Sequence, residues 1–375
     1  MTLGILKEQD GEHRVAVTPD SISALNKLGF DAITIERGVG STAFFDDEAY
    51  TAQGAKVADK DEILKNAQVL VRIHPLDAAD LAKMKAGQII IGQFNPLSER
   101  TPVENMLKAQ VTGFSLDLAP RSTRAQALDV LSSMATVGGY KAVLTAAAHL
   151  PTFFPMFMTA AGTIKPAKVL ILGAGVAGLQ AIATAKRLGS VVEAFDVRAA
   201  AKEEVMSLGA KFVEVEGAVD DKSAGGYAVE QSEEFKQRQA QLIHDKAVAA
   251  DVIICTAQIP GRKAPILIRK ETVAAMKSGA VIVDMAASSG GNCELTENGK
   301  ITHPHGVTIV GDSNLAGSVP KDASVMFGKN VVNFLKLIMI KNELNLNWDD
   351  DIIAATCVAH EGKVVSERLK TAMGV

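Results

Sequence analysis

The feature that most constrains this chain is a glycine-rich run, KVLILGAGVAGL, which begins at Lys168. Its apolar start suits a buried strand, and the alanine-rich residues after it suit a helix. Gly173, Gly175 and Gly178 therefore place a G-x-G-x-x-G motif at a strand–turn–helix junction. There the first glycine permits a tight turn, the second lets the backbone approach a pyrophosphate, and the third lets the helix pack against the strand. The motif predicts a dinucleotide-binding parallel α/β domain.

An acidic residue follows the next predicted strand, at the position that this interpretation requires. The strand covers residues 191–195, and Asp196 lies 18 residues beyond Gly178, where a carboxylate can accept both hydroxyls of the adenosine ribose. The same charge repels a 2′-phosphate, so the sequence favours NAD(H) over NADP(H), although Arg198 could turn toward a phosphate. Two alternatives stay open: a degenerate domain that binds no cofactor, and an Asp196 that only caps a strand. The residues expected to contact the cofactor here are Gly173, Gly175, Val176, Ala177, Gly178, Asp196, Val197 and Arg198.

Short apolar runs alternate with helical segments along most of the chain, which indicates parallel βαβ units. The predicted strands cover residues 3–6, 32–35, 69–73, 89–91 and 114–116, and then residues 169–172, 191–195, 212–215, 252–255, 281–284 and 307–310. An alanine-rich helical stretch at residues 127–149 divides the two series, and a second helical pattern follows at residues 323–346. The polar tail contains two short strand candidates around Ile352 and Val364.

These patterns predict the α/β class, with two Rossmann-like doubly wound parallel-sheet domains. The second is a dinucleotide-binding domain of residues 141–324, inserted in the first. The first comprises residues 1–140 and 325–375, so the C-terminal tail completes it. A chain of 375 residues is long enough for two such domains.

Composition narrows the classes of function. The 39 Lys and Arg residues against 43 Asp and Glu residues give a net charge of −4, so no overall positive field attracts nucleic acid. The three widely spaced cysteines form neither a C-x-x-C pair nor a disulfide framework, which indicates a reducing compartment. The N-terminus lacks an export signal, and the longest nearly apolar run, residues 169–185, contains the motif glycines between two lysines, so we expect a soluble chain. No cluster of histidines, cysteines and acids predicts a metal site.

A second group of polar residues follows the predicted strand at residues 114–116. Arg121 could bind a phosphate or a carboxylate, Gln126 could bind a ribose or a carboxamide, and Asp129 could orient the arginine. Polar groups at the end of a parallel strand suit a ligand site. The residues alone leave an equal alternative, a solvated loop that caps the following helix.

Several of these segments together resemble one family. They are MTAAGT from Met158, the run at residues 173–189, DVRA from Asp196, AGGY ending at Tyr227, and GGNC ending at Cys293. They are similar to the α subunits of proton-translocating NAD(P) transhydrogenases over essentially the whole chain. The resemblance is strongest to the form in which the NAD(H)-binding portion is a separate soluble polypeptide, usually bacterial.

The resemblance implies a homodimeric subunit that holds NADH and passes its hydride directly to NADP+ bound on a partner β subunit. Hydride transfer would be coupled to proton translocation through membrane subunits, including a separate polypeptide that forms the membrane portion of the α subunit. The chain would then be peripheral on the cytoplasmic face of the bacterial inner membrane and would meet the membrane only through its partners.

The same resemblance implies roles for particular residues. Arg121, Gln126 and Asp129 match a family loop that lies over the nicotinamide, with Ser132 nearby. Gly226 and Tyr227 match a mobile loop whose tyrosine helps to close the site, although a passive surface tyrosine is the alternative. Hydride transfer between two nicotinamides needs approach, orientation and exclusion of water more than proton transfer, so we expect no general base.

The related alanine dehydrogenases offer a second hypothesis. They share the pattern that appears here as Arg14-x-Ala-x-x-Pro, so it does not discriminate between the two activities. They handle the amino acid and its proton with a lysine and a histidine, but the corresponding segments of this chain have His74 and Gln93. That difference argues against a stand-alone amino-acid dehydrogenase. A module that senses NADH without turnover is a third possibility. His74 is interpreted as a polar cap, and Cys293 as structural.

Overall fold

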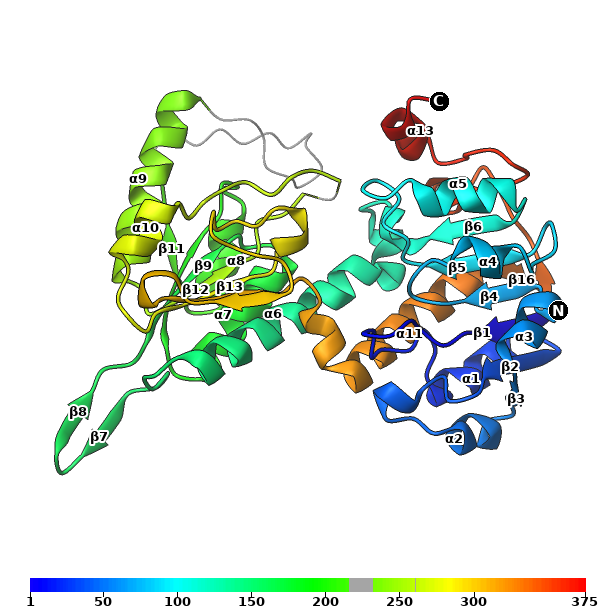
Figure 1. The fold of residues 1–375 in the computed structure, drawn as a ribbon, viewed down its shortest axis with the longest axis horizontal. Coiled ribbons are helices and arrows are strands. Elements are labelled where there is room, and N and C mark those ends of the chain that lie inside the picture. The colour runs from blue at the N-terminus through cyan, green and yellow to red at the C-terminus, as the bar shows by residue number, and fades with distance from the viewer. Residues whose placement is uncertain (216–231, 260) are drawn as a thin grey trace. The chain divides into compact units, whose positions relative to one another are not determined.

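The chain divides into two compact units in a computed structural model that describes residues 1–215, 232–259 and 261–375 (Figure 1). Unit 1 contains Met1–Met134 and Gly317–Val375, and unit 2 contains Ala135–Ala316. The sequence patterns predict boundaries near residues 140 and 325, and the compact units divide after Met134 and before Gly317. The first falls inside helix α6 (Val130–His149), and a boundary within one continuous helix has no signature in the sequence.

Unit 1 contains a seven-stranded sheet in the order β18-β6-β5-β4-β1-β2-β3. Its strands are β1 (Thr2–Ile5), β2 (Ala32–Glu36), β3 (Lys56–Ala58), β4 (Val69–Val71), β5 (Ile89–Gly92), β6 (Thr112–Ser115) and β18 (Cys357–Ala359). Its helices are α1 (Pro19–Asn26), α2 (Asp47–Ala52), α3 (Lys60–Asn66), α4 (Ala78–Leu81), α5 (Thr101–Lys108), α11 (Pro320–Ile338), α12 (Asp351–Thr356) and α13 (Glu367–Met373). All neighbouring strands are parallel except β18, which the C-terminal segment adds antiparallel to β6.

Unit 2 contains a second seven-stranded sheet in the order β11-β10-β9-β12-β13-β15-β14. Its strands are β9 (Lys168–Leu172), β10 (Val191–Phe195), β11 (Lys211–Val213), β12 (Val252–Cys255), β13 (Val281–Asp284), β14 (Lys300–Thr302) and β15 (Thr308–Gly311). Its helices are α7 (Val176–Arg187), α8 (Ala201–Ser207), α9 (Glu233–Ala249) and α10 (Lys270–Ala275). Apart from antiparallel β14, the order is that of a doubly wound dinucleotide-binding sheet, and it reverses direction between β9 and β12.

The central strands of the unit 2 sheet, β9, β12 and β13, are buried on both faces, which is why their sequences are continuous apolar runs. Val169 and Ile171 of β9 belong to the core cluster beneath α6, α7 and α8. Leu170 and Leu172 belong to the opposite cluster, beneath α9 and α10. Side chains of successive strand residues point to opposite faces, so one strand supplies both cores.

The tail of the chain differs from its sequence prediction. The strand expected around Ile352 is wrong, because that residue lies in helix α12. The carboxylate of Asp350 accepts hydrogen bonds from the backbone N–H groups of Ile352 and Ile353 and so caps the helix. Val364 lies in an irregular segment after β18, not in a strand.

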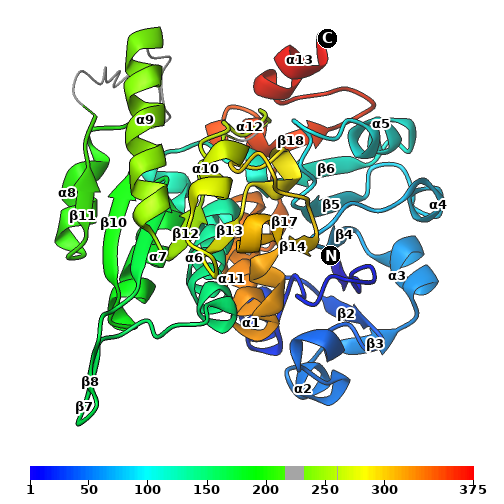
Figure 2. The same cartoon turned by 60° about the vertical axis from the view of Figure 1, so that its left-hand side comes forward.

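Two antiparallel strands of unit 2, β7 (Phe157–Thr159) and β8 (Gly162–Ile164), form a hairpin that extends away from the sheet of that unit (Figures 1 and 2). A smaller hairpin, β16 (Met339–Ile340) and β17 (Glu343–Leu344), follows α11 in unit 1. No helix among the described residues has the length and apolar character needed to cross a bilayer.

Candidate functional site

The glycine motif forms the turn between β9 and α7. Gly173 has a φ of +99°, in the region that favours glycine, because the chain must reverse sharply after the strand. A Cβ on Gly178 would lie 1.9 Å from the carbonyl oxygen of Gly173, so only glycine allows the helix to begin this close to the strand. A Cβ on Gly175 would meet nothing within 4 Å. The first and third glycines therefore shape the turn, whereas the space beside the second is open.

The space beside Gly175 fits a pyrophosphate. Gly175 is exposed and is the N-cap residue of α7, which runs for 12 residues from Val176. The first N–H groups of a helix have no acceptor within the helix, and together with the helix dipole they attract an anion. A pyrophosphate at this position would be bound by the backbone N–H groups of the first turn of α7.

Asp196 lies directly after β10 and is hydrogen-bonded to this turn. Its carboxylate accepts from the backbone N–H of Ala174 at 2.7 Å. It also accepts from Arg198 three times, from the backbone N–H at 2.8 Å and from Nε and Nη2 at 2.9 Å each. The Asp196 side chain is 8% exposed and that of Arg198 is 27% exposed. A carboxylate so placed can accept from ribose hydroxyls if the arginine moves aside.

The segment that follows β12 lies beside the glycine turn. Strands β9 and β12 are neighbours at the point where the strand order reverses, which is where ligands bind in such sheets. The Thr256 hydroxyl donates to the carbonyl oxygen of Gly173 at 2.9 Å. Sequence reasoning did not identify Thr256. Its position directly after an apolar strand of the same sheet is the sequence feature that could have identified it.

The second predicted group lies in unit 1: Arg121 precedes a 3₁₀ segment at Thr123–Leu128, Gln126 lies on it, and Asp129 directly precedes α6. Arg121 and Gln126 are exposed. The Asp129 carboxylate accepts from the backbone N–H of Ser132 at 3.0 Å and from its hydroxyl at 2.6 Å, so it caps α6.

The C-terminal region of the chain holds this loop. Asn330 and Asn333 of α11 both donate from Nδ2 to the carbonyl oxygen of Ala127, at 2.9 Å each. Arg124 donates to both carboxylate oxygens of Asp350, at 2.8 and 2.6 Å, and also pairs with Asp351. Arg121, Gln126, Asp129 and Ser132 thus lie on one segment of unit 1, whereas Gly173, Gly175, Val176, Ala177, Gly178, Asp196, Val197 and Arg198 surround one turn of unit 2. Gly226 and Tyr227 lie outside the described residues.

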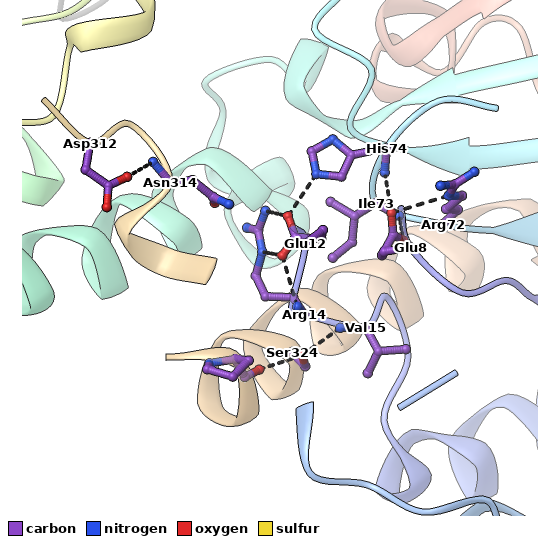
Figure 3. A network of polar contacts seen from close by, with 11 residues as sticks. Glu8, Glu12, Arg14, Val15, Arg72, Ile73, His74, Asp312, Asn314 and Ser324 are labelled. Atoms are coloured by element: carbon purple, nitrogen blue, oxygen red, sulfur yellow. Dashed lines mark hydrogen bonds and ion pairs between the residues drawn. The ribbon is translucent and has the colours of Figure 1, made fainter. Parts of the chain in front are cut away.

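A buried ionic network follows strands β1 and β4, where the strand order of the unit 1 sheet reverses (Figure 3). The Glu8 carboxylate accepts from the backbone N–H groups of Ile73 at 2.6 Å and His74 at 3.1 Å, and from Arg72 Nε at 3.3 Å. Burial raises the pKa of Glu8, and the nearby charge of Arg72 opposes that rise.

Glu12 is the second buried carboxylate of this network, and it pairs with Arg14 and His74. It accepts from Arg14 Nε at 2.8 Å and Nη2 at 2.6 Å, and it lies 2.8 Å from His74 Nε2. Burial alone would raise the pKa of Glu12, but the hydrogen bonds with Arg14 and His74 outweigh burial and hold it well below its ordinary value. The sequence predicted that the side chain of His74 is a polar cap, whereas in the structure its ring pairs with Glu12 and only its backbone N–H donates to Glu8. The pairing of its ring with Glu12 was not predicted.

The three cysteines are free thiols, and all are buried. Burial raises the pKa of Cys293 to about 11 and that of Cys357 to about 12. Thiols of this kind stay protonated at neutral pH and are poor nucleophiles. Among the residues that the structure describes, no group of three or more histidine, cysteine or acidic side chains is arranged to bind a metal ion.

Comparison with known proteins gives two family matches and several close relatives. The N-terminal domain of the Alanine dehydrogenase/PNT family matches residues 4–138, and its C-terminal domain matches residues 142–367. A Rhodospirillum rubrum protein, named as the first portion of NAD(P) transhydrogenase subunit alpha, is 44% identical over 98% of this chain and 99% of its own length. An alanine dehydrogenase of Mycobacterium tuberculosis is 27% identical over 100% of this chain and 97% of its own length.

A solved structure shares the whole architecture. The crystal structure of transhydrogenase from Sinorhizobium meliloti superposes with a TM-score of 0.90 at 42% identity, covering 97% of this chain and 100% of that one. The predicted class, two Rossmann-like parallel-sheet domains, is confirmed by this match and by the two family domains.

Proposed function

The chain belongs to the alanine dehydrogenase/PNT family, and from that premise we propose that it is the NAD(H)-binding subunit of a proton-translocating NAD(P) transhydrogenase. The resemblance inferred from its motifs is confirmed by the relatives, which are oxidoreductase subunits. The observation that carries the proposal is the turn of unit 2, where an open helix N-terminus adjoins Asp196 after the second strand.

In this proposal the chain binds NADH and supplies one half of an active site. The cofactor supplies the hydride. The N-terminus of α7 binds the pyrophosphate, and Asp196 accepts from the adenosine ribose. Arg121 and Gln126 orient the nicotinamide and adjoin the partner's nucleotide, Asp129 fixes the start of their helix, and Tyr227 helps to exclude water. No side chain transfers a proton at the reacting carbons.

The partners follow from the same proposal. NADP(H) binds to a β subunit, and the proton crosses the membrane through that subunit and a separate polypeptide that forms the membrane portion of the α subunit. This chain is peripheral on the cytoplasmic face of the inner membrane. The name of the Rhodospirillum rubrum relative, which describes one portion of a divided subunit, supports an assembly of several polypeptides.

The β7–β8 hairpin supports a homodimer. The hairpin and the residues just before it carry a group of exposed large apolar side chains, Phe153, Met156, Phe157, Met158 and Ile164, of which Met158 is 73% exposed. Clusters of this kind on a soluble protein mark contact surfaces. We expect Met158→Asp to convert a dimer into a monomer in analytical ultracentrifugation, with Ile301→Asp, at another exposed apolar side chain of unit 2, as a control that stays dimeric.

The alternative activity, amino-acid dehydrogenation, finds little support in unit 1. A carboxylate substrate needs an available cation, but Arg14 and His74 are both engaged by the buried carboxylate of Glu12. Displacing Glu12 from two hydrogen-bonded partners would leave a buried charge without compensation. The chemistry of this network fits a structural role.

The test is NADH-dependent reduction of an NADP+ analogue, followed by absorbance. The chain is assayed alone and then mixed with the NADP(H)-binding domain of a transhydrogenase β subunit, and activity is expected only in the mixture. An inactive mixture, despite NADH binding, would refute the proposal. Reduction of NAD+ by the lone chain with alanine would instead support the dehydrogenase.

A matched variant connects this activity to the predicted turn. Gly175→Val fills the open space, and the backbone there has a φ of −75°, which valine tolerates. Because valine is a poorer N-cap residue than glycine, we expect a small loss of thermal stability, by about 1 kcal/mol, together with loss of NADH binding. Normal binding by this variant would place the nucleotide elsewhere.

A further inference from the structure

A buried asparagine connects two loops at the carboxyl ends of the unit 2 strands. Asn292 follows the two glycines of the GGNC segment and is fully buried. Its Nδ2 donates to the carbonyl oxygens of Ala257 and Pro265 at 2.8 Å each, and its Oδ1 accepts from the backbone N–H of Ala257 at 3.0 Å. One side chain therefore satisfies both backbone polar groups of Ala257.

Asp284 fixes the backbone of Asn292. It is the last residue of β13 and is also fully buried. Its Oδ2 accepts from the backbone N–H groups of Asn292 at 2.8 Å and Cys293 at 3.0 Å, and from the hydroxyl of Thr296 at 2.7 Å. The loop after β13 is thus anchored to the end of its own strand.

The segment that Asn292 holds is the one that contacts the glycine turn. The backbone N–H of Thr256 donates to the carbonyl oxygen of Leu172 at 2.8 Å, and its hydroxyl donates to that of Gly173 at 2.9 Å. A Cβ on Gly173 would lie 2.7 Å from this hydroxyl, so the two segments are in close contact. Asp284 is therefore connected to the turn by hydrogen bonds through Asn292 to Ala257, by the peptide bond between Ala257 and Thr256, and by the hydrogen bonds of Thr256.

We propose that Asn292 is a positioning residue for the nucleotide-binding turn. It acts through Ala257 and Thr256, because its amide is wholly used by backbone groups and is not accessible to a ligand. The identity of the ligand as NADH rests on the proposed function, but the positioning of the turn does not. Without this amide, three backbone groups, the N–H and C=O of Ala257 and the C=O of Pro265, lose a hydrogen-bond partner, and the segment beside Gly173 loses its fixed position.

The main variant is Asn292→Ala, and its control is Val273→Ala. Val273 lies on α10 and is fully buried in the same core cluster as Cys293, so its truncation destabilises unit 2 without touching the hydrogen-bonded connection. A second pair tests the last step. Thr256→Val removes the hydroxyl that reaches Gly173 and keeps the shape of the side chain, whereas Thr256→Ser keeps the hydroxyl.

Two measurements use the full chain at a temperature where every variant is folded by circular dichroism. Hydrogen–deuterium exchange of a peptide covering residues 172–179 is followed without nucleotide, and the Kd for NADH is measured by fluorescence titration. We expect Asn292→Ala and Thr256→Val to accelerate exchange in this peptide and to raise the Kd about tenfold. We expect Val273→Ala and Thr256→Ser to leave both near the wild-type values.

Exchange at the wild-type rate in Asn292→Ala would overturn the proposal, as would equal acceleration in Val273→Ala. If Asn292→Ala does not fold, wild-type exchange in Thr256→Val would overturn it in the same way. Failure of the wild-type chain to bind NADH would refute the proposed function alone, because the exchange comparison without nucleotide still tests the positioning of the turn.

Discussion

Replacing Asp196 by asparagine is expected to change which nucleotide the chain prefers. The carboxylate accepts four hydrogen bonds, three of them from Arg198 and one from the backbone N–H of Ala174. An amide has nearly the same size but no charge and only one acceptor atom. The substitution therefore weakens the pairing that holds the guanidinium of Arg198, which is 27% exposed, on residue 196, and favours its approach to a 2′-phosphate.

The size of the change follows from two contributions. Loss of charged hydrogen bonds to the ribose hydroxyls weakens NADH binding by about 1.5–3 kcal/mol. A carboxylate about 4 Å from a phosphate repels it by about 1 kcal/mol in water and about 4 kcal/mol near a protein surface, and the amide removes this repulsion. The ratio of the NADPH and NADH dissociation constants should therefore change by about 50-fold or more in favour of NADPH.

Fluorescence titration with NADH and NADPH measures both constants, and a double-mutant cycle separates the causes. Arg198→Ala alone should leave NADH binding close to wild type, because Asp196 is then free to bind the ribose. Asp196→Asn with Arg198→Ala should lose the gain in NADPH affinity. Since Asp196 also accepts from Ala174, thermal melting must show that each variant is folded.

A ratio within about threefold of wild type, in a folded Asp196→Asn variant, would refute this reasoning. It would mean that the carboxylate does not face the ribose, which is the alternative of a plain strand-end cap. A gain in NADPH affinity that persists without Arg198 would show that relief of repulsion alone suffices.

Three further predictions concern unit 1 and the thiols. Burial opposes the ionisation of Glu12, but its hydrogen bonds with Arg14 and His74 prevail and lower its pKa below 4.5. The ionised carboxylate therefore stabilises the fold above that pH, and this contribution to the free energy of unfolding is lost as the pH falls. Glu12→Gln should thus lower the melting temperature at pH 7 by an amount that shrinks below about pH 4.5, and a pH-independent difference would contradict this. Arg124→Ala should slow hydride transfer in the reconstituted mixture severalfold. It should change the melting temperature by less than Glu12→Gln does at pH 7, since exposed ion pairs contribute about 0–1 kcal/mol to stability. An unchanged rate would show that the ion pair of Arg124 with Asp350 does not position the loop. The buried cysteines should not react with Ellman's reagent until the chain is denatured, and one fast thiol in the native chain would contradict their raised pKa values.

The glycine turn and the parallel strands other than the three-residue edge strand β3 could be predicted because their signals are local. A strand buried on both faces must be apolar throughout, and Gly173 and Gly178 are required by the backbone of their own turn. The antiparallel edge strands β14 and β18 were not predicted. Each has three residues, and β18 pairs with residues far away in the sequence, so no short window contains its partner.

Contacts between distant segments explain what the sequence could not show at the sites. Asp196 was found because it follows a strand at a characteristic spacing, but its engagement by Arg198 depends on side-chain conformation. The β-branched side chain of Ile352 suggested a strand, whereas the N-cap provided by the Asp350 carboxylate stabilises a helix there. The role of Asn292 was not identified from the sequence, because its partners Ala257 and Pro265 come from another loop.

The insertion of unit 2 into unit 1 has a consequence for synthesis on the ribosome. Ala135–Ala316 is one continuous stretch, whereas unit 1 needs both ends of the chain. Gly113 in β6 pairs with Ala359 in β18, and the Phe114 ring packs 5.2 Å from that of Phe334. The nucleotide-binding unit is therefore complete while β6 still has an open edge and an uncovered aromatic ring. The nascent chain carries this aggregation-prone edge until Cys357–Ala359 emerges and pairs with β6.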